Sequence, residues 1–288
     1  MNVFRHYTQA ELELQYDSVA RSPELTATRD AREQRVAFEA GEARKGANAR
    51  LDVVYGAHAR EKIDVFQAAR PDAPLMAFIH GGYWKQRSKN DFAWMAPAFT
   101  QRGIAFASIG YPLCPQVRIG DIVGSLRRAL LHLADNAASL GCDPGRIHVA
   151  GHSAGSHLAA MMAATDFSTR GASATLVKSA TCISGLYDLE PLAMVKVNQD
   201  LKLRPGDIAP LSPVRLAPRP HVTINATVGD MEAEEFVRNT KELIAAWRGH
   251  GADVTEIAAP GFYHFDVADE FGRSGRPMFE RVVKVIEG

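Results

Sequence analysis

The sequence predicts an α/β fold: a mostly parallel central sheet with helices on both faces and an N-terminal helical extension. Three observations indicate it. Two short segments that alternate apolar and polar residues come first, continuous apolar segments follow, and amphipathic stretches then separate strand-like segments as far as the C-terminus. Alternation is typical of strands with one buried face, and continuous apolar runs of strands covered on both faces. Strands that alternate with helices predict a parallel sheet, because a parallel connection needs a long crossover.

Residues 1–50 are predicted to form a helical extension rather than a separate domain. The stretches 11–20 and 26–46 are charged and rich in Ala, Glu and Arg, as expected for exposed helices. They hold too few apolar residues to build a core of their own. We therefore expect one domain over residues 1–288, in which residues 51–288 form the core and the extension packs over part of it.

The core is predicted to begin with a hairpin, since residues 51–56 and 62–68 alternate as a half-buried strand pair does. Further strands are expected at residues 75–80, 104–110, 147–151, 179–185, 221–229 and 252–259. Helices are expected at residues 91–102, 120–139, 153–164, 234–251 and 276–288. The proline-rich residues 203–220 are predicted to be a long loop of the same domain.

Charge and composition exclude two classes of partner. The 288 residues include 33 Lys+Arg and 33 Asp+Glu with no basic block, so no nucleic-acid partner is expected. No apolar run approaches the roughly 18–20 residues that span a bilayer, so no membrane association is expected. The N-terminus is too polar for a signal peptide. These features favour a cytoplasmic protein.

The motif GHSAG, Gly151 to Gly155, is the strongest single indication of chemistry. A strand pattern precedes it and a helix pattern follows, which is the strand-turn-helix context of a nucleophile elbow. The glycines allow the turn to tighten, and the hydroxyl of Ser153 is left at the positive N-terminal end of the helix. Ser153 is therefore the candidate nucleophile. The alternative is a serine that caps the helix in a tight turn.

The motif HGGYW directly follows a predicted apolar strand. Two consecutive glycines let backbone N–H groups turn into a cavity, where they can hold the oxyanion of a tetrahedral intermediate. We expect the donors to be the N–H groups of Gly82 and Tyr83, together with that of Ala154 after the nucleophile.

The other residues of this loop are expected to support it. His80 and Gly81 are predicted to brace the loop backbone rather than to transfer protons. Tyr83 and Trp84 are predicted to form an aromatic wall of a substrate pocket.

A serine nucleophile needs a base and an orienting acid. In a fold of this kind the chain order is serine, acid, histidine, with the acid and the base each following a late strand. His264 is the only histidine after the last predicted strand and is the expected base. The loop after residues 221–229 offers several carboxylates, of which Glu232 is the preferred acid and Asp230 the alternative.

No cofactor and no metal are expected. The histidines follow no HExxH or similar ligand spacing, and neither GxGxxG nor GxxxxGK[ST] occurs. The three cysteines have no CxxC spacing, which excludes a structural zinc site and a disulfide scaffold in practice.

Taken together, these motifs resemble the α/β-hydrolase fold and superfamily, in its esterase/lipase branch with an HGG oxyanion loop. More closely, the chain is similar to the kynurenine formamidase (arylformamidase) family. The matching segments are ELELQY near the N-terminus, HGGYW at 80–84, GHSAGSHLAAMM at 151–162, SGLYDLEPL at 184–192, LSPVRL at 211–216, EAEEF at 232–236 and HF at 264–265. This resemblance covers nearly the whole chain and implies Ser153 as nucleophile, His264 as base and Glu232 as acid.

Two places differ from the pattern of that family. The residues after Glu232 are Ala233 and Glu234, where the family has serine and proline. The residue before His264 is Tyr263, where an aspartate is usual. The three positions that the resemblance marks as catalytic are kept.

The resemblance implies a serine hydrolase that cleaves a small acyl group through an acyl-enzyme, with residues 51–288 as its catalytic core. The first candidate is an arylformamidase acting on formamides of the N-formylkynurenine type. A carboxylesterase acting on short-chain or aryl esters would use the same machinery and is the alternative. A non-catalytic ligand receptor with this fold is an alternative of a different class. The expected partner is a small, aromatic ester or formamide, and a homodimer is the assembly considered.

Overall fold

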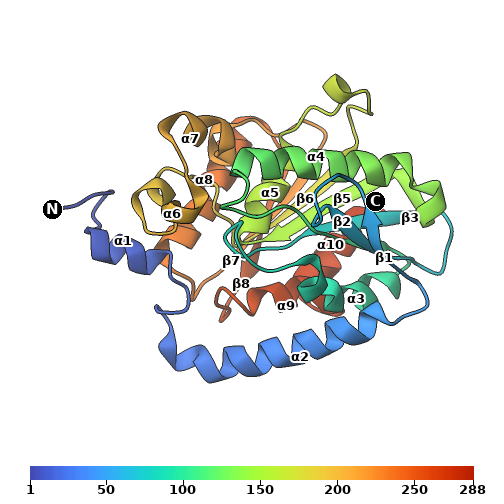
Figure 1. Cartoon of the computed structure of the whole chain (residues 1–288), viewed down its shortest axis with the longest axis horizontal. Helices are drawn as coiled ribbons and strands as arrows, with labels where there is room; N and C mark the ends of the chain where they lie inside the picture. Colours follow the sequence, from blue (N-terminus) through green and yellow to red (C-terminus); the bar gives the residue numbers. More distant parts are fainter.

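A computed structural model describes residues 1–288 and contains one eight-stranded sheet (Figure 1). The strand order is β1-β2-β4-β3-β5-β6-β7-β8. The pairs β1–β2 and β2–β4 are antiparallel, and every later pair is parallel. The strands are β1 (Ala49–Val54), β2 (Lys62–Phe66), β3 (Ala73–Ile79), β4 (Ala105–Ile109), β5 (Cys142–His152), β6 (Val177–Ile183), β7 (Thr223–Gly229) and β8 (Val254–Ala259). The predicted hairpin and the mostly parallel sheet are confirmed.

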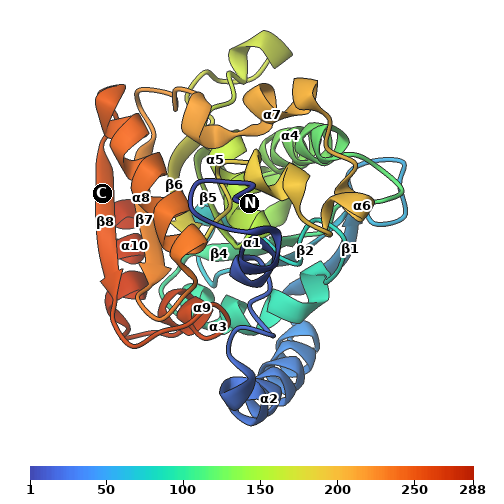
Figure 2. The same ribbon diagram turned by 90° about the vertical axis from the view of Figure 1, so that its left-hand side faces the viewer.

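The helices lie on both faces of this sheet, as predicted (Figures 1 and 2). They are α1 (Gln9–Gln15), α2 (Thr26–Arg44), α3 (Ala96–Thr100), α4 (Ile119–Asp135), α5 (Ala154–Ala163), α6 (Asn198–Leu201), α7 (Pro205–Leu211), α8 (Glu234–Gly249), α9 (Val267–Gly272) and α10 (Pro277–Glu287). Short 3-10 turns connect several of them. None of the helices is long and apolar enough to cross a membrane.

Alternate residues of the central strands build two separate apolar layers. Leu75 and Ile79 of β3 point into the layer covered by α4, α5 and α8. Met76 and Phe78 of the same strand point into the other layer, with the aromatic side chains of α3, α9 and α10. Because successive strand residues face opposite sides, a strand buried on both faces must be apolar throughout. This explains why β3 is a continuous apolar run.

The N-terminal extension packs on the outside of this core. Helix α1 contacts α8, and α2 lies against the 3-10 turn Lys89–Met95 (Figure 2). Val36 and Ala40 form the buried face of α2, while most of its other residues stay exposed. The extension therefore depends on the core for burial, in keeping with its low apolar content. The division of the chain into one domain with a catalytic core stays a prediction.

The proline-rich stretch 203–220 is not the continuous loop that was predicted. It contains α7 and the 3-10 turn Pro213–Arg215. Pro205 occupies the first turn of α7, where a missing N–H costs no hydrogen bond, and the carboxylate of Asp207 accepts the amide hydrogen of Arg204. Proline at such a position starts a helix instead of preventing one.

Candidate active site

The turn between β5 and α5 holds Ser153 in a strained conformation. Its φ is 57° and its ψ is −123°, in the region that a residue with a side chain rarely adopts. The hydroxyl makes no capping hydrogen bond to α5, so a simple helix cap does not describe it. It is presented at the N-terminal end of α5, where the helix dipole favours negative charge.

Close backbone packing explains both glycines of the GHSAG motif. A Cβ on Gly151 would lie 2.1 Å from the carbonyl oxygen of Gly155. A Cβ on Gly155 would lie 2.0 Å from the carbonyl oxygen of Ile79 in β3. Backbone oxygens cannot swing aside as the end of a side chain can. Glycine therefore lets α5 approach the sheet closely enough to carry the turn.

Ser153, His264 and Glu232 are joined by a chain of hydrogen bonds. His264 Nε2 lies 3.0 Å from Ser153 Oγ, and His264 Nδ1 lies 2.7 Å from Glu232 Oε2. A carboxylate can only accept, so Nδ1 carries the ring proton and Nε2 is left to accept the proton of the serine hydroxyl. The three side chains are buried, which strengthens these interactions. This arrangement can activate a serine for attack on a carbonyl carbon.

Asp230, the alternative acid, does not reach the histidine. It is exposed, and its Oδ1 accepts the amide hydrogen of Gly261 at 2.7 Å. Asp230 is the first residue after β7 and points to the surface, while the chain turns back at Glu232, whose amide hydrogen bonds to the carbonyl of Gly229. This turn decides which of the two carboxylates in the loop reaches His264. The sequence alone does not predict it.

Two donors that sequence reasoning missed hold the second oxygen of Glu232. Ser184 Oγ donates to Glu232 Oε1 at 2.5 Å, and the amide of Gly229 donates to the same oxygen at 2.8 Å. Ser184 follows β6 directly and lies beside the acid because β6 and β7 are neighbours in the sheet. Its position at the start of the segment SGLYDLEPL was the one available signal.

His152 supports the backbone that carries the base. Its Nε2 donates to the carbonyl oxygen of His264 at 2.7 Å, and the two rings lie 4.7 Å apart. Burial lowers the pKa of His152 well below its ordinary value, so its ring is neutral. Next to the nucleophile in sequence, it therefore positions the base without adding a competing charge.

The HGG loop places free amide groups beside Ser153. Gly82 has φ 108° and Tyr83 has φ 50°, both left-handed, which turns successive N–H groups in an unusual direction. The amides of Gly82, Tyr83 and Ala154 donate no hydrogen bond within the chain. Both residues of the loop line the same cavity as Ser153. Free amides at such a place can hold an oxyanion.

His80 and Gly81 contact the backbone of this loop and of the nucleophile turn. His80 Nδ1 donates to the carbonyl oxygen of Gly81 at 2.8 Å, and its ring stacks on Tyr111 with centroids 4.1 Å apart. Burial lowers the pKa of His80 to about 3, so the ring stays neutral. A Cβ on Gly81 would lie 2.8 Å from the carbonyl oxygen of His152, which fixes the loop against the nucleophile turn.

The predicted pocket role of Trp84 is wrong. Its side chain is fully buried, packs edge-on to the ring of His157 at 5.1 Å and is absent from the cavity wall. Tyr83 does line the cavity. With left-handed backbone at both residues, the two neighbouring side chains point in different directions: Tyr83 lines the cavity and Trp84 packs in the core.

The site opens into a cavity of about 850 Å³. Its floor is formed by the HGG loop, Ser153 and His264, and its outer wall by the N-terminal extension and by residues near α6. The aromatic side chains that line it are Tyr16, Tyr83, Phe92, Trp94 and Phe265. No group of three or more His, Cys, Asp or Glu side chains is placed to hold a metal ion.

Comparisons with known proteins agree with this fold. The BD-FAE family model matches residues 63–190. A kynurenine formamidase from Danio rerio is 28% identical, and the aligned region covers 99% of this chain and 99% of that protein. A crystal structure of a "putative thioesterase" from a Silicibacter species superposes with a TM-score of 0.82 at 30% identity, over 96% of this chain and 99% of that one. The chain belongs to the α/β-hydrolase superfamily.

This α/β-hydrolase shares its fold with esterases. An esterase from Pyrobaculum calidifontis superposes with a TM-score of 0.70 at 18% identity, over 95% of this chain and 96% of that one. Kynurenine formamidases are among the relatives that match nearly its full length. The chain is therefore similar to kynurenine formamidases over its length and to esterases in its fold, as its motifs predicted.

Proposed function

We propose that this protein is a serine hydrolase in which Ser153, His264 and Glu232 are the nucleophile, base and acid. The observation that carries the proposal is the continuous contact from Ser153 Oγ to His264 Nε2 and from His264 Nδ1 to Glu232. His264 takes the hydroxyl proton as Ser153 attacks the carbonyl carbon of the substrate. Glu232 stabilises the imidazolium that forms.

The tetrahedral intermediate would be held by backbone amides. Its oxyanion accepts hydrogen bonds from the N–H groups of Gly82, Tyr83 and Ala154, which have no partner within the chain. His264 then gives its proton to the leaving group, and the acyl group stays on Ser153. Water, deprotonated by the same histidine, attacks the acyl-enzyme and releases the acid.

The proposed substrate is an aryl formamide of the N-formylkynurenine type. The full-length kynurenine formamidase relatives support it, and so do the aromatic side chains of the cavity. A small acyl group places little demand on space beside the HGG loop, while the larger cavity beneath the extension suits an aromatic leaving group.

Hydrolysis of short-chain or aryl esters is the second candidate. Its support is a match to a probable isoprenylcysteine methylesterase from rice, 37% identical over 38% of this chain. That match covers 26% of the relative, so it supports a shared type of chemistry rather than a shared substrate. The non-catalytic receptor has no such support.

A substrate panel separates these candidates. It compares kcat/KM for N-formylkynurenine, p-nitrophenyl acetate and a short acyl thioester, in the wild type and in Ser153→Ala. We expect the highest kcat/KM for the formamide and a loss of about 10³-fold or more in the variant. A formamide rate equal to the uncatalysed rate, with ester hydrolysis retained, would replace the first candidate by the second. Unchanged turnover by Ser153→Ala would refute the serine mechanism.

We further expect a homodimer and a cytoplasmic location. A homodimer is checked by the mass of the protein in light scattering, and a cytoplasmic location by fractionation of the source cells.

A further inference from the structure

A segment of the N-terminal extension forms one wall of the active-site cavity. We call residues 9–20, which comprise α1 and the turn after it, the N-terminal strap. Most strap residues from Ala10 to Ala20 line the same cavity as Ser153 and His264, although more than 130 residues separate them in sequence. The strap is therefore placed to contact a substrate that is bound at Ser153.

Tyr16 joins the strap to two separate parts of the site. Its phenol donates to Glu235 Oε2 at 2.7 Å, in a buried contact with the first turn of α8. Its backbone carbonyl accepts a hydrogen bond from the phenol of Tyr83 at 2.5 Å. Tyr83 belongs to the HGG loop, and its own amide is one of the free donors beside Ser153. One residue of the strap thus contacts both helix α8 and the oxyanion loop.

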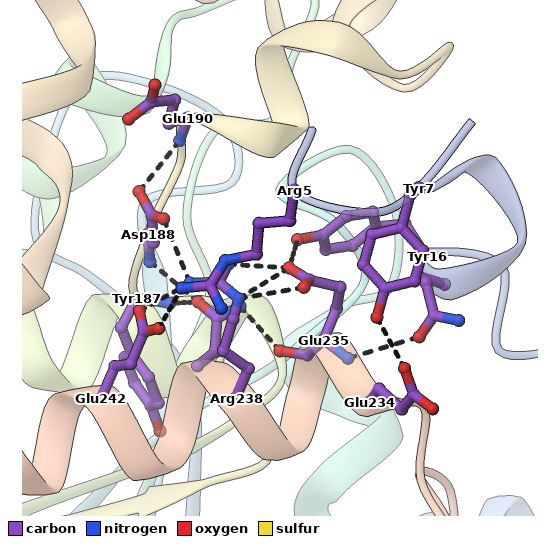
Figure 3. Close-up of polar contacts among 12 residues, drawn as sticks. Arg5, Tyr7, Tyr16, Tyr187, Asp188, Glu190, Glu234, Glu235, Arg238 and Glu242 are labelled. Carbon is purple, nitrogen blue, oxygen red and sulfur yellow. Dashed lines mark hydrogen bonds and ion pairs between the residues drawn. The ribbon is translucent and has the colours of Figure 1, made fainter. Parts of the chain in front are cut away.

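The contact at α8 is built into a buried ionic cluster (Figure 3). Arg238 binds both carboxylate oxygens of Glu235, from Nε at 3.0 Å to each and from an Nη at 2.7 Å to Oε2. Glu235 is 1% exposed, so its charge is compensated by Arg238 and by the phenol of Tyr16. Burial, followed by the charge of Glu235, raises the pKa of Tyr16 well above its ordinary value, which keeps the phenol protonated as a donor.

The same turn of α8 reaches the catalytic histidine. Phe236, next to Glu235, packs on the ring of His264 with centroids 4.4 Å apart and on Tyr16 at 6.4 Å. Glu232 lies two residues before α8 begins. A strap fastened to Glu235 is therefore fastened to the helix that begins just after the acid and packs on the base.

We propose that Tyr16 is a positioning residue that fixes the N-terminal strap as the wall of the leaving-group pocket and so sets selectivity for aromatic leaving groups. The proposal rests on the proposed hydrolase function but not on the formamide as substrate. Loss of the phenol would leave Arg238 and Glu235 paired while it weakens the attachment of the strap to α8, where Gln15 Oε1 still accepts the amide hydrogen of Glu235 at 3.3 Å. The pocket would then widen on its outer side, and the nucleophile, base and acid would stay in place.

The test compares two esters with the same acyl group, phenyl acetate and ethyl acetate, in a pH-stat assay. We define selectivity as the ratio of their kcat/KM values. We expect Tyr16→Phe to lower selectivity at least about 5-fold relative to wild type, mainly through a higher KM for phenyl acetate, because weaker contacts in a pocket cost roughly tenfold or more in discrimination. The ethyl acetate kcat should change less than twofold.

Tyr7→Phe is the matched control. The phenol of Tyr7 donates to Glu234 at 2.8 Å, so this variant removes a bond of the same kind between the N-terminal segment and the same helix turn. Tyr7 does not line the cavity. Selectivity should stay within twofold of wild type. An equal loss of selectivity in both variants would overturn the specific role of Tyr16.

A second variant and a stability measurement separate positioning from simple folding. Tyr83→Phe keeps the amide donor and removes the second hydrogen bond that holds Tyr16, so it should lower selectivity in the same direction. If Tyr16→Phe lowers only the melting temperature and leaves selectivity unchanged, the proposal is wrong. Because both substrates are esters, absent formamide hydrolysis would contradict the substrate proposal alone, and activity retained by Ser153→Ala would contradict the mechanism.

Discussion

Glu232 binds His264 through one carboxylate oxygen and is held through the other. Oε2 lies 2.7 Å from His264 Nδ1, while Oε1 accepts hydrogen bonds from Ser184 and from the amide of Gly229. The carboxylate therefore cannot rotate away from the ring without breaking both supporting bonds. The carboxylate of Glu232 is therefore held in the orientation in which it binds the ring of His264.

Replacement of this acid should reduce catalysis without removing the nucleophile. In Glu232→Gln an amide faces Nδ1, so the ring is no longer stabilised as an imidazolium and its tautomer is not fixed. We expect kcat/KM to fall about 10²–10⁴-fold. Asp230→Asn is the control, because an amide oxygen can still accept from Gly261, and its kcat/KM should stay within twofold. A larger loss in Asp230→Asn than in Glu232→Gln would show that the wrong carboxylate has been assigned.

The local parts of this site are predictable from the sequence, because steric constraints within a tight turn restrict which residue types its neighbouring positions can hold. The elbow needs glycine at positions 151 and 155, where added Cβ atoms would meet backbone within 2.1 Å. His264 was identified because it alone follows the last strand. Such features depend on one turn and on the order of the strands, and both can be read along the chain.

Contacts between distant segments were not predictable in this way. Ser184 meets Glu232 only because β6 and β7 pair, and Tyr16 meets Glu235 across 219 residues. Trp84 was misassigned for a related reason: its side chain direction depends on the left-handed backbone of the loop, with φ 56°, and not on its aromatic character. Residue type indicates what a side chain can do, whereas direction and tertiary neighbours decide whether it does so.

Ser184 should be needed for the acid's orientation. Ser184→Ala removes one of the two donors to Glu232 Oε1, so we expect kcat to fall about 3- to 10-fold and stability to fall by about 1–2 kcal/mol. Ser212→Ala is the matched control, since Ser212 Oγ accepts the amide hydrogen of Leu189 in an equally buried place outside the site. That variant should lose stability and keep kcat. Steady-state kinetics and urea unfolding check both, and equal kcat in the two variants would contradict the role of Ser184.

A side chain added at Gly151 should disrupt the turn that carries the nucleophile. Gly151→Ala would place a methyl group 2.1 Å from the carbonyl oxygen of Gly155, so α5 must shift and Ser153 with it. We expect at least about 10²-fold lower activity or failure to fold, because strain of this kind lies among the most destabilising changes. Gly41→Ala, in open space within α2, should instead stabilise by up to about 1 kcal/mol. If a fluorophosphonate labels Gly151→Ala to the same extent as the wild type, the steric explanation is wrong.

His148 should make the fold sensitive to acid. It lies in β5, its Nδ1 is 2.8 Å from Ser179 Oγ, and burial lowers its pKa to about 4, from about 6.5 in an unfolded chain. The folded state binds this proton less readily, so the contribution is fully present above pH 6.5 and is lost as the pH falls through 6.5 towards 4. At about 1.4 kcal/mol per pH unit, the loss from this group approaches about 3 kcal/mol. His148→Gln, which keeps a polar group for Ser179, should show a shallower decline of unfolding free energy between pH 7 and pH 4.5 in urea titrations. An identical decline in the variant and the wild type would mean that other groups, such as the buried His80 and His157, account for the acid sensitivity.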